Sequence, residues 1–299
     1  MGRWGRLLRL SLAPTAAADV AAGIVLSTGI WPRGSAPWLL VLASLCVYHG
    51  ALALNDWADR ERDRVHRPDR PIPSGAIAPS HALLAAALLL AMGPLLTFAQ
   101  EPRSGGLLLA VALLAVTYDV AGRGPWSGPL LLALCRAGNL GVGLSFQEDS
   151  LHPPWLLLLF SYGAYVFLIS RLGRLEDRED RIEERRLHPR WIVLGAALLL
   201  FAPPVLFLPS DESERTTLSL LASLTLAAAG AAGLVRRASA SDWSPRSIQG
   251  LMGMALRRLL VFSAAVAVLP GTEHAWVASA VILCGYPLSH VLRRVFPPS

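Results

Sequence analysis

The chain has 299 residues, of which 54% are hydrophobic and only 16% are charged, and its mean hydropathy is +0.48. Soluble domains carry about 25% charged residues, so this composition argues against an ordinary soluble protein and indicates a membrane protein. The net charge of +6 rests on arginine alone, and the arginines lie between apolar segments, which indicates membrane topology rather than binding to nucleic acid.

The N-terminal segment carries three arginines ahead of an apolar stretch that continues past Asp19 to Trp31. A basic start followed by apolar residues is also typical of a signal peptide. Because this stretch runs on well beyond the small residues at 16–18, we expect an uncleaved first span. The use of arginine in place of lysine, with much alanine and leucine, suggests a GC-rich bacterial source.

Apolar segments long enough to cross a bilayer recur along the whole chain without a long polar break. We therefore expect a single domain over residues 1–299. The ninth segment contains Arg257 and Arg258, and this predicts an amphipathic stretch followed by a short broken helix. The sequence predicts an all-α bundle of nine or ten transmembrane helices. The ten segments are 11–31, 36–54, 80–99, 105–120, 127–147, 153–172, 191–208, 216–235, 248–269 and 272–292.

Arginines are concentrated in alternate loops, above all at 55–79 and 173–190, whereas the loops between them carry acids such as Glu148 and Asp211. Arginine-rich loops stay on the cytoplasmic side of a membrane. We expect a multi-pass protein of the bacterial cytoplasmic membrane with these two charged loops facing the cytoplasm.

The loop after the second segment carries the clearest chemical pattern. If the helix continues into it, Asn55, Asp59 and Asp63 are spaced i, i+4 and i+8 and share one face. Mg²⁺ takes hard oxygen ligands and is usually held by one or two carboxylates together with substrate phosphates. Arginines such as Arg64 and Arg70 would bind the outer phosphate oxygens. The alternative for such a charged loop is a solvated, salt-bridged surface.

The same residues resemble the UbiA-type intramembrane prenyltransferases, which carry N-D-x-x-D-x-x-x-D after their second helix, followed by R-P-x-x-S-G. Both motifs are complete here, at 55–63 and 70–75. The resemblance implies helices ringed around a central cavity, a polar cap over it, and Mg²⁺-dependent use of an isoprenoid diphosphate. The stretches 14–19 and 117–139 are similar to the EboC-like members, a branch whose acceptor the resemblance does not supply.

The family carries a second acidic motif after its sixth helix, and here this chain departs from the pattern. In one alignment Glu176 and Asp177 match, but Arg174 and Arg181 stand at carboxylate positions. A shifted alignment pairs Glu176 with Asp180 at i, i+4. An arginine at such a position would contact the diphosphate directly in place of a metal, or it would mark lost activity. We include Arg174, Asp177 and Asp180 among the expected substrate-binding residues.

A few polar residues lie within apolar segments, where ionisable groups are rare and are usually paired or functional. Asp19 and Arg136 would pair with each other or line the cavity, unless Asp19 sits near the water. We expect Arg136 and Asn139 to bind substrate. For His49, a hydrogen bond to a neighbouring helix competes with catalysis. Arg123, in a short cytoplasmic turn, matches a basic position that the family uses near the diphosphate.

The expected activity is therefore transfer of a prenyl group from an isoprenoid diphosphate to an unidentified apolar or aromatic acceptor in the bilayer. Asp59, Asp63 and Arg123 would be catalytic, with Mg²⁺ held by Asn55, Asp59 and Asp63. One rival is a non-catalytic lipid-binding or transport protein that keeps the fold, and the altered second motif favours it. Another is a phosphatidyl-alcohol phosphotransferase, but its D-G-x-x-A-R run ahead of G-x-x-x-D-x-x-x-D is missing.

Overall fold

The structure is a computed structural model that describes residues 2–146, 152–175, 189–207 and 214–296. Throughout these ranges the regular elements are helices, and no strand occurs in them. The elements are α1 (Gly2–Leu7), a 3₁₀ turn η1 (Leu10–Leu12), α2 (Ala13–Thr28), α3 (Ala36–Ala58), α4 (Arg60–His66), α5 (Pro79–Phe98), α6 (Pro102–Val120), α7 (Ser127–Leu144), α8 (Pro153–Gly173), α9 (Pro189–Leu199), α10 (Ala202–Leu206), α11 (Glu214–Ser239), α12 (Pro245–Ala267) and α13 (Glu273–Val295).

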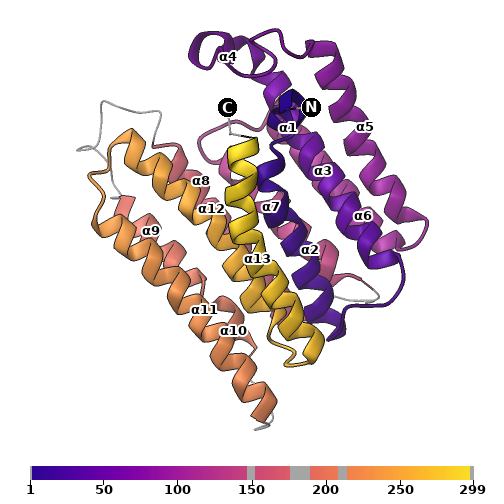
Figure 1. Cartoon of the computed structure of the whole chain (residues 1–299), viewed down its shortest axis with the longest axis vertical. Helices are drawn as coiled ribbons and strands as arrows, with labels where there is room; N and C mark the ends of the chain where they lie inside the picture. Colours follow the sequence, from indigo (N-terminus) through magenta and orange to yellow (C-terminus); the bar gives the residue numbers. More distant parts are fainter. Residues whose placement is uncertain (1, 147–151, 176–188, 208–213, 297–299) are drawn as a thin grey trace.

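The long helices form one bundle in which α2 is central. It packs against α3, α7, α12 and α13, while α3, α5 and α6 cover one side of it and α9 and α11 lie on the other (Figure 1). One apolar core joins α2, α7, α8 and α12, and a second joins α2, α3, α6 and α7. The all-α bundle predicted from the sequence is confirmed.

Eight helices in the described part of the chain are long and apolar enough to cross a membrane, so the predicted count of nine or ten is not confirmed. The two remaining predicted segments are α7 and the pair α9 and α10, neither of which is among the eight. The predicted segment 191–208 is broken after Leu199, just ahead of Pro203 and Pro204. Proline lacks a backbone N–H and disfavours helical backbone in the residue before it, which explains the break.

The expected break in the ninth segment is wrong, because α12 is one helix of 23 residues that runs through Arg257 and Arg258. Arg258 lies against α11 at Gly230 and Gly233, where a side chain in place of the glycine hydrogen would collide with the guanidinium at Gly233. Its Cζ also lies 5.8 Å from the ring centroid of Tyr286. Small residues on one neighbour and an aromatic ring on another therefore accommodate a basic side chain inside the bundle.

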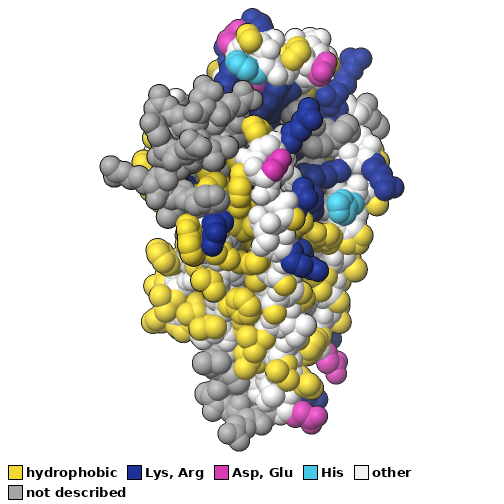
Figure 2. Space-filling model, turned by 90° about the vertical axis from the view of Figure 1, so that its left-hand side faces the viewer, with side chains coloured by type: hydrophobic (Ala, Val, Ile, Leu, Met, Phe, Trp, Pro, Cys, Tyr) yellow, Lys and Arg dark blue, Asp and Glu magenta, His cyan; other side chains and the backbone are white. Residues whose placement is uncertain are grey.

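The outer surface fits a lipid environment. Large apolar side chains such as Leu88, Leu95 and Phe160 are exposed along the long helices. Figure 2 shows that hydrophobic side chains cover the middle of one face and that basic side chains gather toward its upper end. An apolar belt with charged ends is the surface expected of a membrane-spanning bundle.

Candidate functional site

Four polar side chains meet at one end of the bundle, where α3 and α6 end and α7 begins. The Asn55 Nδ2 donates to Asp119 Oδ1 at 2.8 Å. Arg123, in the turn between α6 and α7, donates through Nη2 to Asp119 Oδ1 at 3.0 Å and through Nη1 to Asp59. We call Asn55, Asp59, Asp119 and Arg123 the α3–α6 cluster. Three of the four were expected at the site; Asp119 was not.

The remaining charged residues of the acidic loop form a separate group. Arg70 Nη1 lies 2.5 Å from Asp63 Oδ2 and 3.4 Å from Asp56 Oδ1, and Arg9 Nη2 lies 2.6 Å from Asp56 Oδ1. Asp56, Asp63 and Arg70 are all buried. We call these three residues, together with Arg9, the Arg70 cluster. Buried charges are stable only when paired, and here two carboxylates are matched by two guanidinium groups.

Asn55 and Asp59 thus contact one group of side chains and Asp63 contacts another, while a magnesium site shared by all three stays a prediction. Asp59 is the C-cap of α3, and α4 begins at the next residue, so the helix is interrupted between Asn55 and Asp63. The helical hydrogen bonds from Asp59 N to Asn55 O and from Asp63 N to Asp59 O persist at 2.9 Å. In α4, however, Asp63 pairs with Arg70, which lies in the proline-containing loop that follows α4.

The α3–α6 cluster has the donor chemistry that a magnesium ion requires. Carboxylate and amide oxygens are hard ligands, and Asn55, Asp59 and Asp119 supply both kinds. The side chain of Asp59 is 20% exposed, so this carboxylate is open to solvent and to a ligand. Burial alone would lower the pKa of Arg123, but the nearby carboxylates, Asp59 foremost, raise the pKa above its ordinary value and keep the guanidinium charged.

The end of α8 reaches the same place. Arg174 Nη2 donates to the carbonyl oxygen of Arg123 at 3.1 Å, so a residue expected at the second acidic motif lies beside the α3–α6 cluster. Arg64, by contrast, is exposed and pairs with Glu61 at 2.8 Å. Asp177 and Asp180 lie outside the described residues.

A second polar group lies deep in the bundle. Asp19 is fully buried and contacts Arg136 Nη2 at 3.1 Å, and it accepts hydrogen bonds from Asn139, Tyr162 and Ser263. The predicted pairing of Asp19 with Arg136 is confirmed, and the alternative that Asp19 lies near water is wrong. We call this the Asp19 cluster.

Arg136 and its surroundings face α3. Its Cζ lies 5.6 Å from the ring centroid of Tyr48, and two of its nitrogens, Nε and Nη1, have no hydrogen-bond partner among the described residues. Asn139 also accepts a hydrogen bond from Ser44 at 2.5 Å. Substrate binding by Arg136 and Asn139 stays a prediction. His49 Nδ1 bonds to the carbonyl oxygen of Leu8 at 2.6 Å, a contact with the N-terminal segment.

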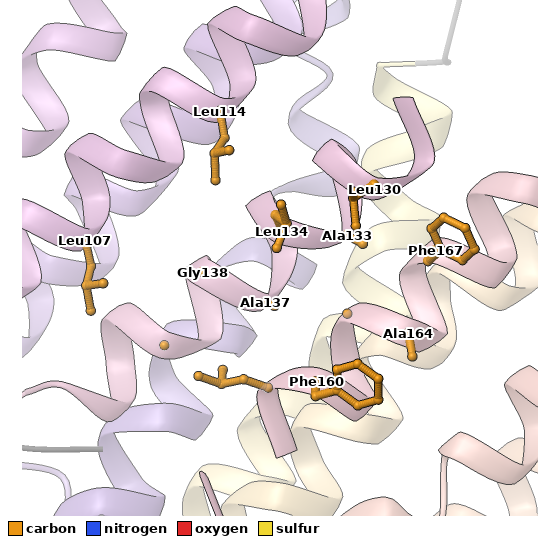
Figure 3. A pocket seen from close by; sticks show the side chains of 13 residues that line it. Leu107, Leu114, Leu130, Ala133, Leu134, Ala137, Gly138, Phe160, Ala164 and Phe167 are labelled. Carbon is orange, nitrogen blue, oxygen red and sulfur yellow. The ribbon is translucent and has the colours of Figure 1, made fainter. Parts of the chain in front are cut away.

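An apolar groove of about 540 Å³ opens between α6, α7 and α8. Figure 3 shows Leu107, Leu134 and Phe160 around it, with Ala137 and Gly138 on its floor. Because Leu134 and Phe160 are exposed, the groove belongs to the lipid-facing surface. It is distinct from the central cavity that the resemblance implies, which stays a prediction.

Sequence reasoning missed Asp119. A usable signal was present, because an acid at the end of an apolar segment stands four residues before Arg123, the spacing at which helical residues interact. What the sequence could not supply was its contact with Asn55, which is 64 residues away along the chain.

The comparisons with known proteins agree with this fold. The model of the UbiA prenyltransferase family matches residues 12–256. The bacteriochlorophyll synthase 33 kDa chain of Cereibacter sphaeroides is 34% identical over 169 residues, which are 52% of this chain and 56% of that protein. The digeranylgeranylglyceryl phosphate synthase of Methanothrix thermoacetophila is 31% identical over 172 residues, 54% of this chain and 61% of that protein. The chain thus spans about half the length of these relatives.

Solved structures show the same architecture. A UbiA homolog from Archaeoglobus fulgidus bound to GPP and Mg²⁺ superposes with a TM-score of 0.62 at 16% identity and covers 89% of this chain and 99% of that one. A UbiA homolog from Aeropyrum pernix gives a TM-score of 0.53 at 19% identity, over 87% and 98% of the two chains. At these identities the likeness establishes the fold.

Proposed function

Because the chain belongs to the UbiA prenyltransferase family, we propose that it transfers a prenyl group from an isoprenoid diphosphate to an apolar or aromatic acceptor within the membrane. The observation that carries the proposal is the α3–α6 cluster. Carboxylates, an amide and two arginines from four different helices or turns gather at the charged end of an apolar bundle. An amphipathic substrate with a diphosphate head and an apolar chain matches that arrangement.

Asn55 and Asp59 are the motif residues that lie in the cluster, and they would hold Mg²⁺. When bound, the ion neutralises the diphosphate and makes it a better leaving group. Arg123 and Arg174 bring guanidinium groups to the same place, and both are suited to phosphate oxygens because their planar donor pairs match them.

In the proposed reaction the bond between C1 of the prenyl group and the diphosphate oxygen breaks, and its electron pair leaves with the diphosphate. A nucleophilic atom of the acceptor forms the new bond to C1 and then loses its proton. The residues around the cluster would hold the diphosphate, while the apolar helices below it would keep water from the reacting carbon. Water exclusion matters because hydrolysis would otherwise compete with transfer.

The acceptor stays open. The two relatives are named for a bacteriochlorophyll and for a glyceryl phosphate lipid, so their names indicate different acceptor chemistries. The Asp19 cluster is where an acceptor would meet hydrogen-bond donors inside the bundle, since Arg136 Nε and Nη1 lack partners among the described residues. On this ground we retain Arg136 as a proposed substrate contact, and Asn139 is retained as its neighbour in the same cluster, since both contact Asp19.

The test is a transfer assay with purified protein in nanodiscs. Labelled geranyl, farnesyl or geranylgeranyl diphosphate is incubated with a bacterial lipid extract, with Mg²⁺ or with EDTA. Label in the lipid fraction and free diphosphate are both measured. We expect Mg²⁺-dependent transfer by the parent protein and by Asp69→Asn, an exposed carboxylate of the same loop, but not by Asp59→Asn.

A specific observation keeps one rival in view. In one of the two alignments Arg174 stands where the family pattern has a carboxylate, and its hydrogen bond to the Arg123 carbonyl brings a positive charge beside the α3–α6 cluster. A protein that binds the diphosphate lipid but does not cleave it would show Mg²⁺-dependent retention of every labelled diphosphate with no release of diphosphate. That result would replace transfer by a lipid-binding or transport function.

A further inference from the structure

Asp119 is a carboxylate at the proposed magnesium site that the family motif does not supply. It ends the apolar helix α6, and its side chain is only 2% exposed. Its Oδ1 accepts from Asn55 Nδ2 at 2.8 Å and from Arg123 Nη2 at 3.0 Å. It therefore touches the first residue of the N-D-x-x-D-x-x-x-D motif directly, across 64 positions of sequence.

Asp63, the last carboxylate of that motif, is committed elsewhere. Its Oδ2 lies 2.5 Å from Arg70 Nη1, and its side chain is 5% exposed. To ligate an ion beside Asn55 and Asp59, Asp63 would have to leave Arg70 inside a buried network. Breaking one partner out of a buried ion pair is strongly unfavourable, because the remaining charge is left uncompensated.

The charge balance of the two clusters points the same way. In the Arg70 cluster two carboxylates are matched by Arg9 and Arg70. Within the described ranges, Asp59 and Asp119 of the α3–α6 cluster share one guanidinium, that of Arg123. Arg174 donates to a backbone carbonyl there rather than to either carboxylate. The excess negative charge thus lies at Asp59 and Asp119, and a cation would be stabilised there.

We propose that Asp119 takes the place of Asp63 as the third protein donor for Mg²⁺, together with Asn55 and Asp59, and that Asp63 has a structural part in anchoring the loop to Arg70. This inference rests on the proposed function. Asp119 also brings a carboxylate from the last turn of α6 to a site that Arg174 borders, where one alignment of the second acidic motif has an acid. Hard carboxylate oxygens around Mg²⁺ are the expected ligand set.

The test measures metal binding rather than turnover. Mn²⁺, which accepts the same oxygen ligands, is titrated into the purified protein, and the free ion is followed by electron paramagnetic resonance. We expect Asp119→Asn to raise the dissociation constant for Mn²⁺ by about tenfold or more. Asp63→Asn should leave it within about threefold while lowering the unfolding temperature, and Asp69→Asn, the exposed control, should change neither.

A second variant guards against loss of folding. Asp119→Cys replaces a hard ligand by a soft thiolate, so its affinity for Mn²⁺ should fall while Cd²⁺ binds more tightly than to the parent protein. Asp63→Cys should show no such gain. The native thiols Cys46, Cys135 and Cys284 could also bind Cd²⁺, so Cd²⁺ binding by the parent protein is measured as the baseline.

The outcomes separate this inference from the proposed function. Normal Mn²⁺ binding in Asp119→Asn with a loss in Asp63→Asn, or equal losses in both, overturns the assignment even if Mg²⁺-dependent transfer is observed. If Mn²⁺ binding depends on Asp119 but the protein transfers no prenyl group, Asp119 is upheld as a metal ligand and the proposed transferase function is refuted. If the parent protein binds no Mn²⁺, with or without geranyl diphosphate, both the assignment of Asp119 and the proposed Mg²⁺-dependent function are refuted.

Discussion

Replacing Asp19 by asparagine is the sharpest structural perturbation that the bundle offers. Asp19 is fully buried in α2, where it faces Arg136 at 3.1 Å and accepts hydrogen bonds from Tyr162, Asn139 and Ser263. Asparagine has nearly the same shape, so packing is preserved. What changes is the charge, since Arg136 would remain ionised in the interior without its counter-ion.

The size of the effect follows from that charge. Removing one member of a buried ion pair costs about 3–5 kcal/mol in water-soluble proteins. An arginine at the centre of a membrane helix costs about 2.5–3.5 kcal/mol on insertion scales. Both estimates meet near 3 kcal/mol, so we expect Asp19→Asn to lower the free energy of unfolding by about that amount. Adding Arg136→Met removes the orphaned charge, and the double variant should lose less than the sum of the single losses.

The assay is equilibrium unfolding in mixed micelles, with Ser263→Ala as the matched control. That control removes one hydrogen bond to the same carboxylate and should cost only about 1 kcal/mol. A stability of Asp19→Asn within about 1 kcal/mol of the parent would refute the pairing, and so would a double variant whose loss equals the sum.

Three further predictions concern the polar end of the bundle. Asp59→Ala should abolish turnover, because it leaves diphosphate charge uncompensated, whereas Asp180→Ala should have a milder effect; equal losses in a turnover assay over a range of Mg²⁺ would show an intact second acidic motif. Arg174→Ala should weaken binding of isoprenoid diphosphate by about tenfold, as measured by titration, and unchanged affinity would remove Arg174 from the site. Cysteines placed at Ser74 and Arg185 should react from the same, cytoplasmic side, and labelling from opposite faces would contradict the topology.

Much of the fold could be predicted because a bilayer demands long apolar helices with internally satisfied backbones. Hydropathy located α3, α5 and α8 within a few residues. It failed at α12, where Arg257 and Arg258 lie inside a continuous helix. The accommodation of Arg258 by the glycines of α11 depends on how two helices are rotated against each other, and no pattern within α12 encodes that rotation.

The site could be predicted only in part, because sequence spacing describes neighbours along one helix and not contacts between helices. Local spacing linked Asn55 to Asp59, the family resemblance added Arg123, and the structure brings the three side chains together. The partners of Asp119 and Asp63 could not be predicted, because ion pairs within the loop and between helices decide which carboxylates share a cluster. Helical spacing alone assumes one continuous helix, and the helix is interrupted at Asp59.

The central claim is that the chain recognises an isoprenoid diphosphate through a magnesium ion at Asn55 and Asp59. Titration of the purified protein with an unreactive geranyl thiolodiphosphate, in Mg²⁺ and in EDTA, tests it most directly. We predict that EDTA weakens binding by about tenfold or more and that Asp59→Asn binds equally weakly in both conditions. Equal affinity of the parent protein with and without EDTA would contradict the account.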